Sequence, residues 1–458
     1  MRRLALLVVL IPVLAKPDVM EWEKIVRPGI TYRVTIDDEI PRVVHALRIA
    51  NGAAGLGLRP ALSQDRVFGP DAADQGRQTV VGMMRDSSAI AGINADFFPA
   101  NGDPLGAMVV DGRLLSSAAR TRSVVAWGPA GFRFGYLQFA GAITWGDGDP
   151  VSIYGVNEEC GDNMVVLYTS AATVSLSREP ALNVLIESDA EFTPNGEWQG
   201  VFVRFFSEIN TLEISDGHVA LAVRGVPTER ILELREGDEV TISLQHEGID
   251  WEGVTHVAAG GPLLVKAGQK FIPFAEEGFK LEFAENRHPR SAIGVTPAGD
   301  VWLVAVDGRQ SMSDGATLEE LAHVMIDLGC TDAINLDGGG STTLAIAGVV
   351  LNRPSGGRQR AIANSILVID EIAGAQDDGD FVIAGPVEVE LGQETPFRVV
   401  NDRGDAVPHV EVLWAATGSA WIDQSGILRG FEEGEVTVKA IVNGVLRVLT
   451  VRVKEYES

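Results

Sequence analysis

The chain has 458 residues, 46% of them hydrophobic and 22% charged, which is typical of a folded globular protein too long for one ordinary core. It carries 63 acidic and 37 basic side chains, and its formal net charge of -26 repels phosphate backbones and anionic bilayers. Nucleic acid is therefore not expected as a partner. The net charge does not exclude a local basic pocket within the acidic protein.

The N-terminus predicts export. Two arginines open the chain, an apolar stretch runs from Leu4 to Leu14, and Ala15 fits a small-residue cleavage site. The stretch is too short to span a bilayer comfortably. We expect residues 1–15 to be a signal peptide and the mature protein to be secreted or associated with the cell envelope, without membrane insertion after cleavage. An uncleaved anchor is the alternative.

Short strand patterns dominate residues 16–370. β-branched and apolar runs alternate with Gly and Asp-Gly turns, which predicts an α+β domain rich in mixed sheet, with few helices and a mainly β N-terminal portion at residues 16–85. Two hairpins are expected: "AMVVDGRLL", around its Asp-Gly, and "SAIGVTPAGDVWLVAVDGR", which turns between Pro297 and Asp300.

One helix is clearly marked. Thr317 can cap it, Glu320 completes a capping box, and Gly329 ends it. The order from "VWLVAVDGRQ" through this helix to "DAINLD" suits a right-handed crossover between parallel strands, whose carboxyl ends are where ligands gather. Asp307 and Asp337 follow these two strands.

The C-terminal part changes composition. An acidic segment with glycines, residues 371–380, predicts a linker. Residues 381–458 alternate short strands with glycine turns, which favours a small all-β sandwich. The segment "GILRGFEEGEVTVKAIVNG" resembles bacterial immunoglobulin-like modules. Because this part carries no catalytic constellation, spacing or cell-wall association is its expected role.

The pattern Ile-Asn-x-Asp occurs twice, each time at the end of an apolar run. Alternation along a strand places Asn94 and Asp96 on one face, and does the same for Asn335 and Asp337. One such end is ordinary turn chemistry. Two of them, with Asp307 at a third strand end, indicate a functional site.

Groups suited to an anion accompany these carboxylates. A buried carboxylate needs a partner, and Arg290 and Arg309 are the candidates. A loop of small residues follows Asp337: Gly338, Gly339, Gly340, Ser341 and Thr342. It can form a nest of backbone N–H groups for an anion, but it is no Walker loop because no lysine follows. A sugar phosphate, with one anionic and one uncharged polar end, fits this combination.

No metal or cofactor is expected. The chain contains only Cys160 and Cys330, has no CxxC or HExxH, and its seven histidines do not cluster. A rival hypothesis is a metal-dependent phosphodiesterase in which Asp96, Asp307 and Asp337 hold Mg²⁺ or Ca²⁺. Such an enzyme would break the bond at phosphorus.

Eight segments, in family order, resemble the phosphodiester glycosidase domain family: "GINADFF", "GDPLGAMVVDGRLL", "GGPLLV", "HPRSAIGVT", "VWLVAVDGRQ", "SDGATLEELAHVMIDLG", "INLDGGGSTTL" and "RAIANSILV". The resemblance covers roughly Val26 to Asp370, which makes residues 16–370 the expected catalytic domain. It implies hydrolysis of the bond between an anomeric sugar carbon and a phosphodiester oxygen. The expected substrate is a phosphate-linked envelope or extracellular glycan, with an N-acetylaminosugar as the released sugar.

The resemblance also implies the site. The expected catalytic carboxylates are Asp96, Asp307 and Asp337. The expected substrate-binding residues are Asn94, Arg290, Arg309, Asn335, Gly338, Gly339, Gly340, Ser341 and Thr342. Carboxylates stabilise an oxocarbenium-like state, so Asp96 and Asp337 are assigned to the sugar, and the arginines and the loop to the phosphate. A non-catalytic envelope module that binds glycans is the alternative from another class.

Overall fold

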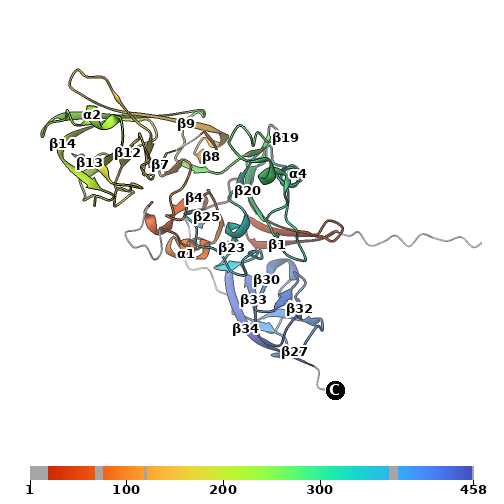
Figure 1. The fold of residues 1–458 in the computed structure, drawn as a ribbon. Helices are drawn as coiled ribbons and strands as arrows, with labels where there is room; N and C mark the ends of the chain where they lie inside the picture. The colour runs from red at the N-terminus through yellow and green to blue at the C-terminus, as the bar shows by residue number, and fades with distance from the viewer. Residues whose placement is uncertain (1–18, 68–75, 118–120, 371–379, 456–458) are drawn as a thin grey trace, which may run out of the picture.

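The computed structural model describes residues 19–67, 76–117, 121–370 and 380–455. The predicted signal peptide and all but the last residue of the predicted linker lie outside these ranges. Strands dominate, so the sheet-rich prediction is confirmed (Figure 1). No helix in the described ranges has the length and apolar character needed to cross a membrane.

An eight-stranded sheet forms one layer of the central body. Its order is β1-β2-β3-β21-β20-β22-β18-β19, and every pair of neighbours is antiparallel. The strands are β1 (Val19–Arg27), β2 (Ile30–Asp37), β3 (Arg42–Ile49), β21 (Val301–Val306), β20 (Arg290–Val295), β22 (Asp332–Leu336), β18 (Leu263–Lys266) and β19 (Gln269–Lys270).

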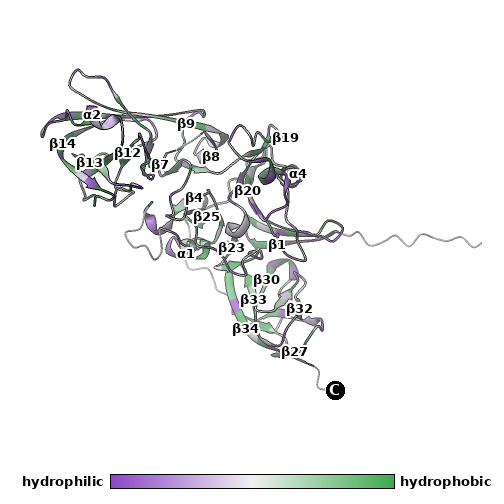
Figure 2. Ribbon diagram, viewed as in Figure 1, coloured by the Kyte–Doolittle hydropathy of each residue, from purple (hydrophilic) through white to green (hydrophobic). Residues whose placement is uncertain are grey.

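A five-stranded antiparallel sheet packs against the first one. Its order is β24-β23-β5-β25-β4. The strands are β24 (Val349–Val350), β23 (Leu344–Ile346), β5 (Ala91–Asn94), β25 (Asn364–Asp370) and β4 (Leu56–Leu62). Ile93 and Ile366 of this sheet share one buried core with Ile293 and Ile334 of the other, and the strands of this body are largely apolar in Figure 2. The two Ile-Asn-x-Asp segments therefore reach the site from different sheets.

The marked helix is confirmed as α4 (Leu318–Asp327). The Thr317 hydroxyl accepts from the Glu320 backbone N–H, and the Glu320 carboxylate accepts from the Thr317 N–H. Its apolar face is buried against the eight-stranded sheet. The other helical segments are short: α1 (Val80–Asp86), α2 (Pro227–Ile231), α3 (Leu281–Glu285), η1 (Ser63–Asp65), η2 (Gly339–Ser341) and η3 (His409–Glu411).

The crossover through α4 joins strands that run in the same direction, as expected, although the two strands are not neighbours in the sheet. β21 and β22 run in the same direction, but β20 lies between them and pairs antiparallel with both. The reason is the hairpin of β20 and β21, itself predicted correctly, which places β20 beside its chain neighbour before the α4 connection crosses over it. Adjacent strands are about 4.8 Å apart, so the ends of β21 and β22 are separated by about 10 Å.

A twelve-stranded sheet builds most of a separate lobe, seen at the upper left of Figure 1. Its order is β11-β12-β15-β13-β14-β16-β9-β8-β17-β6-β7, with β10 paired to β9. The strands are β6 (Met108–Val110), β7 (Arg113–Ser116), β8 (Arg122–Gly128), β9 (Gly131–Trp145), β10 (Val151–Ile153), β11 (Gly155–Val156), β12 (Val165–Tyr168), β13 (Ala181–Glu187), β14 (Gly196–Ile209), β15 (His218–Val223), β16 (Glu239–Glu247) and β17 (His256–Ala259). The predicted hairpin of β6 and β7 is confirmed, with Asp111 and Gly112 both at positive φ.

The C-terminal part is all β and packs on β1. Its strands are β26 (Phe381–Ala384), β27 (Glu388–Glu390), β28 (Thr395–Pro396), β29 (Arg398–Asn401), β30 (Val412–Thr417), β31 (Ala420–Ile422), β32 (Ile427–Gly430), β33 (Gly434–Val442) and β34 (Val445–Lys454). The buried ammonium of Lys24 donates to the carbonyls of His409, at 2.6 Å, and Gln424. Leu413 and Ile441 join the core of the central body. An immunoglobulin-like topology for this part stays a prediction.

Candidate active site

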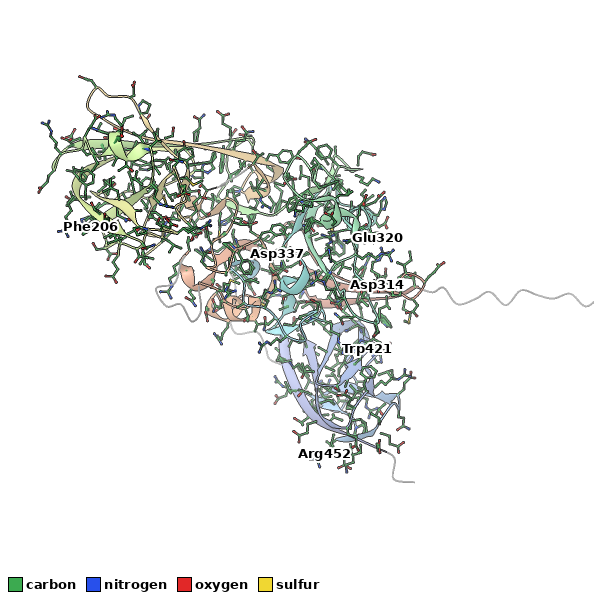
Figure 3. All side chains as sticks on the ribbon, viewed as in Figure 1. Phe206, Asp314, Glu320, Asp337, Trp421 and Arg452 are labelled. Atoms are coloured by element: carbon green, nitrogen blue, oxygen red, sulfur yellow. The ribbon has the colours of Figure 1, made fainter. Side chains whose placement is uncertain are left out.

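The two Ile-Asn-x-Asp segments meet where their sheets end. The backbone N–H of Asp337 donates to the carbonyl of Ala95 at 2.8 Å, and Nδ2 of Asn94 donates to the carbonyl of Asp337 at 2.6 Å. Ile93 and Ala95 point into the shared core, as strand alternation predicts. The structure thus brings Asp96 and Asp337 into one place, labelled by Asp337 near the centre of Figure 3.

Asp96 is a buried carboxyl held by backbone amides. Its side chain accepts from the N–H groups of Phe97 and Gly106, each at 2.7 Å. Gly106 allows this approach because a Cβ there would collide with Ala259 and crowd the carboxylate. Burial raises the pKa of Asp96 to about 7, against the opposing effects of the Arg122 charge and the two amides, while the charge of Asp337 raises it further.

Asp337 is partly exposed and also has hydrogen-bond donors and an arginine nearby. Burial raises its pKa to about 6, while the Ser341 hydroxyl, the Gly338 N–H and the charge of Arg360 act in the opposite direction. The pair therefore has one carboxyl that holds its proton near neutral pH and one that ionises more readily. Two interacting groups with separated pKa values are a common arrangement for acid and base work.

The two asparagines brace the backbone of the site. Oδ1 of Asn94 accepts from the Ser291 hydroxyl at 2.7 Å and from the Thr343 N–H at 3.0 Å. Nδ2 of Asn335 donates to the carbonyls of Gly261, at 2.7 Å, and Leu336, at 2.8 Å. These contacts hold the strand ends together, so both asparagines serve to position the carboxylates.

The glycine loop after Asp337 turns sharply, and two guanidinium groups from other segments lie beside it. Gly339 has a φ of 59°, and a Cβ at Gly338 would come within 2.6 Å of the Pro289 carbonyl. A Cβ at Gly339 would touch the Arg309 guanidinium at 3.3 Å, and one at Gly340 would collide with Arg360. The absence of side chains here lets both cations approach the backbone.

Arg309 and Arg360 are available for an anion. Nη1 of Arg360 donates to Ser341 Oγ at 3.4 Å, and the Arg309 guanidinium lies 3.4 Å from Nδ1 of His288. Neither has an ion-pair partner among the described residues, and both side chains are exposed. Arg309 also adopts a φ of 60°, a conformation that is uncommon for residues with a side chain. Two unpaired guanidinium groups beside a glycine turn suit a phosphate.

Arg290, expected at the phosphate, is instead buried among carbonyl groups. Its Nε donates to Ala316 at 2.9 Å, and its Nη2 donates to Phe283 at 2.6 Å and Asn286 at 3.1 Å. The guanidinium also stacks on the Phe283 ring, 4.7 Å from the centroid. Because these donors are occupied, Arg290 holds the loops behind the site, and the structure does not place it for direct anion binding.

Asp307, expected as a catalytic carboxylate, belongs to another network. Its Oδ2 lies 3.2 Å from His45 Nε2, while its Oδ1 accepts from the Arg353 N–H at 2.7 Å and Asn352 Nδ2 at 3.3 Å. Tyr32 completes the network through a 2.7 Å contact with His45 Nδ1. The intervening strand β20 is the physical reason for the separation from Asp337.

The same separation bears on metal binding. The rival phosphodiesterase needs Asp96, Asp307 and Asp337 around one ion, and the structure does not gather them. Over the described ranges, no group of three or more His, Cys, Asp or Glu side chains is arranged to hold a metal. Cys160 and Cys330 are both buried and unpaired with one another.

Two site residues, Arg122 and Arg360, were missed from the sequence. Arg122 lies over the rings of Phe97, at 5.3 Å, and Phe279, at 5.0 Å, and its buried Nη1 has no partner in the described structure. The segment "RPSGGRQR", which ends in Arg360, was a visible signal because it concentrates three arginines in an acidic chain.

Asp103 and Glu158 are two further carboxyl groups with raised pKa values, and Asp103 experiences the charge of Asp96. Burial raises the pKa of Asp103 well above its usual range, and the charges of Glu158 and Asp96 add to the effect. Burial alone raises the pKa of Glu158 to about 8. With a pKa of about 8, Glu158 is largely protonated at neutral pH.

Comparison with known proteins finds similarity to phosphodiester glycosidases. Residues 191–369 match the family model described as phosphodiester glycosidase; the matched part includes Asp337, Arg309 and Arg360, whereas Asp96 precedes it. The SPbeta prophage-derived protein YomE of Bacillus subtilis is 37% identical over 82 residues, which cover 18% of this chain and 13% of YomE. The N-acetylglucosamine-1-phosphodiester alpha-N-acetylglucosaminidase of Bos taurus is 29% identical over 153 residues, covering 31% of this chain and 29% of that protein.

The chain therefore aligns with less than one third of the length of either relative. A crystal structure of a hypothetical protein from Synechocystis superposes with a TM-score of 0.61 and 25% identity, covering 74% of this chain and 62% of that one. The fold thus extends well beyond the part matched by sequence. Over residues 191–369, the chain is thus similar to the phosphodiester glycosidase family.

Proposed function

We propose that the protein is an exported hydrolase that cleaves the bond between an anomeric sugar carbon and a phosphodiester oxygen. The observation that carries the proposal is that Asp96 and Asp337 lie together beside a glycine turn. This turn is flanked by Arg309 and Arg360, neither of which has an ion-pair partner among the described residues. One side of this site suits a developing positive charge and the other suits a phosphate. The substrate is a phosphate-linked glycan of the envelope or extracellular space, and the released sugar is an N-acetylaminosugar.

The chemistry divides between the two sides. As the bond from the anomeric carbon to the phosphate oxygen breaks, positive charge grows on the sugar, and the ionised Asp337 stabilises it. Water supplies the oxygen that replaces the phosphate on the anomeric carbon, and its proton passes to a carboxylate of the pair. The bonding electrons leave with the phosphate monoester, whose charge is stabilised by Arg309, Arg360 and the loop amides.

Asp96 keeps the pair singly charged. A phosphate is a fair leaving group, so its departure depends little on the proton of Asp96. The main effect of this proton is to prevent repulsion between the carboxylates of Asp96 and Asp337. With the Asp96 proton in place, Asp337 can ionise at lower cost. The proposal thus needs Asp96 protonated and Asp337 ionised in the active form.

The position of bond cleavage is tested with isotopic water. Hydrolysis of a nitrophenyl phosphodiester of N-acetylglucosamine in ¹⁸O-labelled water should place the label in the free sugar, because water attacks carbon. Mass spectrometry of both products gives the answer. Label in the phosphate would support the metal-dependent phosphodiesterase, and no released sugar, from this diester or from purified wall polymer, would support a module that only binds glycans.

Replacement of the ionised carboxylate tests its assignment. Asp337→Asn should lower kcat for the same diester by roughly 10³-fold or more, because the neutral amide cannot stabilise the cationic sugar. Asp332→Asn, at the opposite end of β22, is the matched control and should keep near-normal turnover. Near-normal turnover by a folded Asp337→Asn protein would contradict the mechanism.

The phosphate side is tested through its arginines. Arg309→Gln and Arg360→Gln should each lower kcat/KM by about 10- to 100-fold, since each removes a charged hydrogen bond to the phosphate. Arg59→Gln, which breaks only an exposed ion pair with Asp111, serves as the control. Equal kinetics for all three variants would show that the phosphate lies elsewhere.

The two carboxyl groups predict a bell-shaped dependence on pH. The kcat/KM should rise as Asp337 ionises, with its pKa of about 6, and should fall as Asp96 loses its proton, with its pKa of about 7. Asp96→Asn imitates the protonated form, so residual activity in that variant should no longer fall on the alkaline side. An unchanged alkaline limb would assign that limb to another group.

A further inference from the structure

A cleft of about 520 Å³ lies between the central body and the C-terminal part. Trp22 of β1 and the network of His45 and Asp307 form one wall, and Trp421 and Lys439 of the C-terminal part form the opposite wall. Trp421 is labelled in Figure 3 where the C-terminal part meets the body. The cleft therefore exists only because the two parts are packed together.

Hydrogen bonds and buried apolar contacts fix the position of the C-terminal part relative to the central body, and so fix the two walls of the cleft. The Lys24 hydrogen bonds to His409 and Gln424 anchor β1 to the C-terminal part, and Trp22 Nε1 donates to Ser425 Oγ at 3.2 Å. Leu413 of the C-terminal part is buried in the core of the body. These contacts hold the two walls of the cleft in place.

The cleft carries positive charge in a strongly acidic protein. Arg353, Arg358 and Lys439 line it, and none of them has an ion-pair partner in the described ranges. Of the acidic lining residues, Asp307 is already engaged by His45, Asn352 and a backbone amide, which leaves Asp423. With a net charge of -26 on the chain, unpaired cations gathered in one hollow indicate an anionic ligand.

The cleft adjoins the candidate active site through two short pieces of chain. Gln310 lines the cleft and follows Arg309, and Gln359 lines it and precedes Arg360. Asn352 joins the two directly, because its Nδ2 donates to Asp307 and, at 3.1 Å, to the carbonyl of Thr342 in the loop region. The proposed phosphate position between Arg309 and Arg360 is therefore one residue along the chain from two residues that line the cleft.

We infer that this cleft binds the part of the substrate beyond the scissile phosphate, and that the substrate is a polymer of sugars linked through phosphodiesters. The inference rests on the proposed function for the position of the scissile bond. Arg353, Arg358 and Lys439 contact further phosphates, while the partly exposed rings of Trp22 and Trp421 pack against sugar faces. The C-terminal part thereby contributes directly to substrate choice.

Binding is measured separately from cleavage. The probe is a polysaccharide of N-acetylglucosamine-1-phosphate repeats, titrated by calorimetry against the full chain carrying Asp337→Asn so that it is not cut. Adding Arg358→Gln, Trp421→Ala and Lys439→Gln together should weaken this binding by about tenfold or more and reduce its dependence on salt. The matched control combines Arg429→Gln, Phe431→Ala and Lys454→Gln, exposed positions of the same part outside the cleft, and should bind as before.

Comparison ligands separate charge from sugar. Uncharged chitin oligosaccharides should bind much more weakly than the phosphate-linked polymer, because they lack the anionic links. Single-stranded DNA should also bind weakly, because the chain as a whole carries a net charge of -26. Equal binding of the cleft and control variants to the polymer, or tighter binding of DNA than of the polymer, would overturn the inference.

Turnover of a small substrate keeps the two proposals distinct. With Asp337 intact, the triple cleft variant should hydrolyse the nitrophenyl diester within about twofold of the wild type but cleave the polymer about tenfold more slowly. If the wild type releases no sugar from either substrate, the proposed function fails, whereas cleft-dependent polymer binding would still support a binding cleft. Loss of small-diester turnover together with polymer cleavage in the triple variant would contradict a role confined to the polymer.

Discussion

The structure of the site depends on one junction between two sheets. The ends of β5 and β22 are tied by the hydrogen bond from Asp337 N–H to Ala95 and by the amide of Asn94 on the Asp337 carbonyl. The shared apolar core below this junction excludes water, so the carboxyl groups above it ionise reluctantly. Burial at this junction raises both pKa values, while the donors and the arginine charge near each carboxyl act in the opposite direction.

Basic side chains gather at the candidate site and the cleft although the chain has a net negative charge. The chain has a net charge of -26, yet among the described residues Arg309 and Arg360 beside the glycine loop have no ion pair, nor do the cations that line the neighbouring cleft. A long-range negative field disfavours polyanions in general, while a local basic strip can still hold a phosphate that arrives with a fitting sugar. Such an arrangement selects an anionic ligand by the fit of its sugar and phosphate to the site, and it does not attract polyanions over long distances.

The packing of the C-terminal part gives it a role beyond that of a spacer. Its contacts with β1 are buried and include the Lys24 ammonium, which would be costly to leave without partners. The same contacts place Trp421 and Lys439 opposite the network of His45 and Asp307. Asp307 thereby has a structural role: it holds the segment of Asn352 and Arg353, which lines the cleft and contacts the loop region through Asn352.

Local rules were sufficient for the elements and for part of the site. The capping box at Thr317, the Asp-Gly hairpin and the alternation that turns Asp96 and Asp337 away from the core are all set by neighbouring residues, so the sequence by itself determined them. Tertiary structure decided the rest. The insertion of β20 separated Asp307 from Asp337, carbonyl groups of α3 and of two loop positions occupied Arg290, and Arg360 entered the site from the segment before β25. These outcomes depend on which strands pair across long stretches of chain, and pairing between distant strands leaves no short-range pattern from which it can be read.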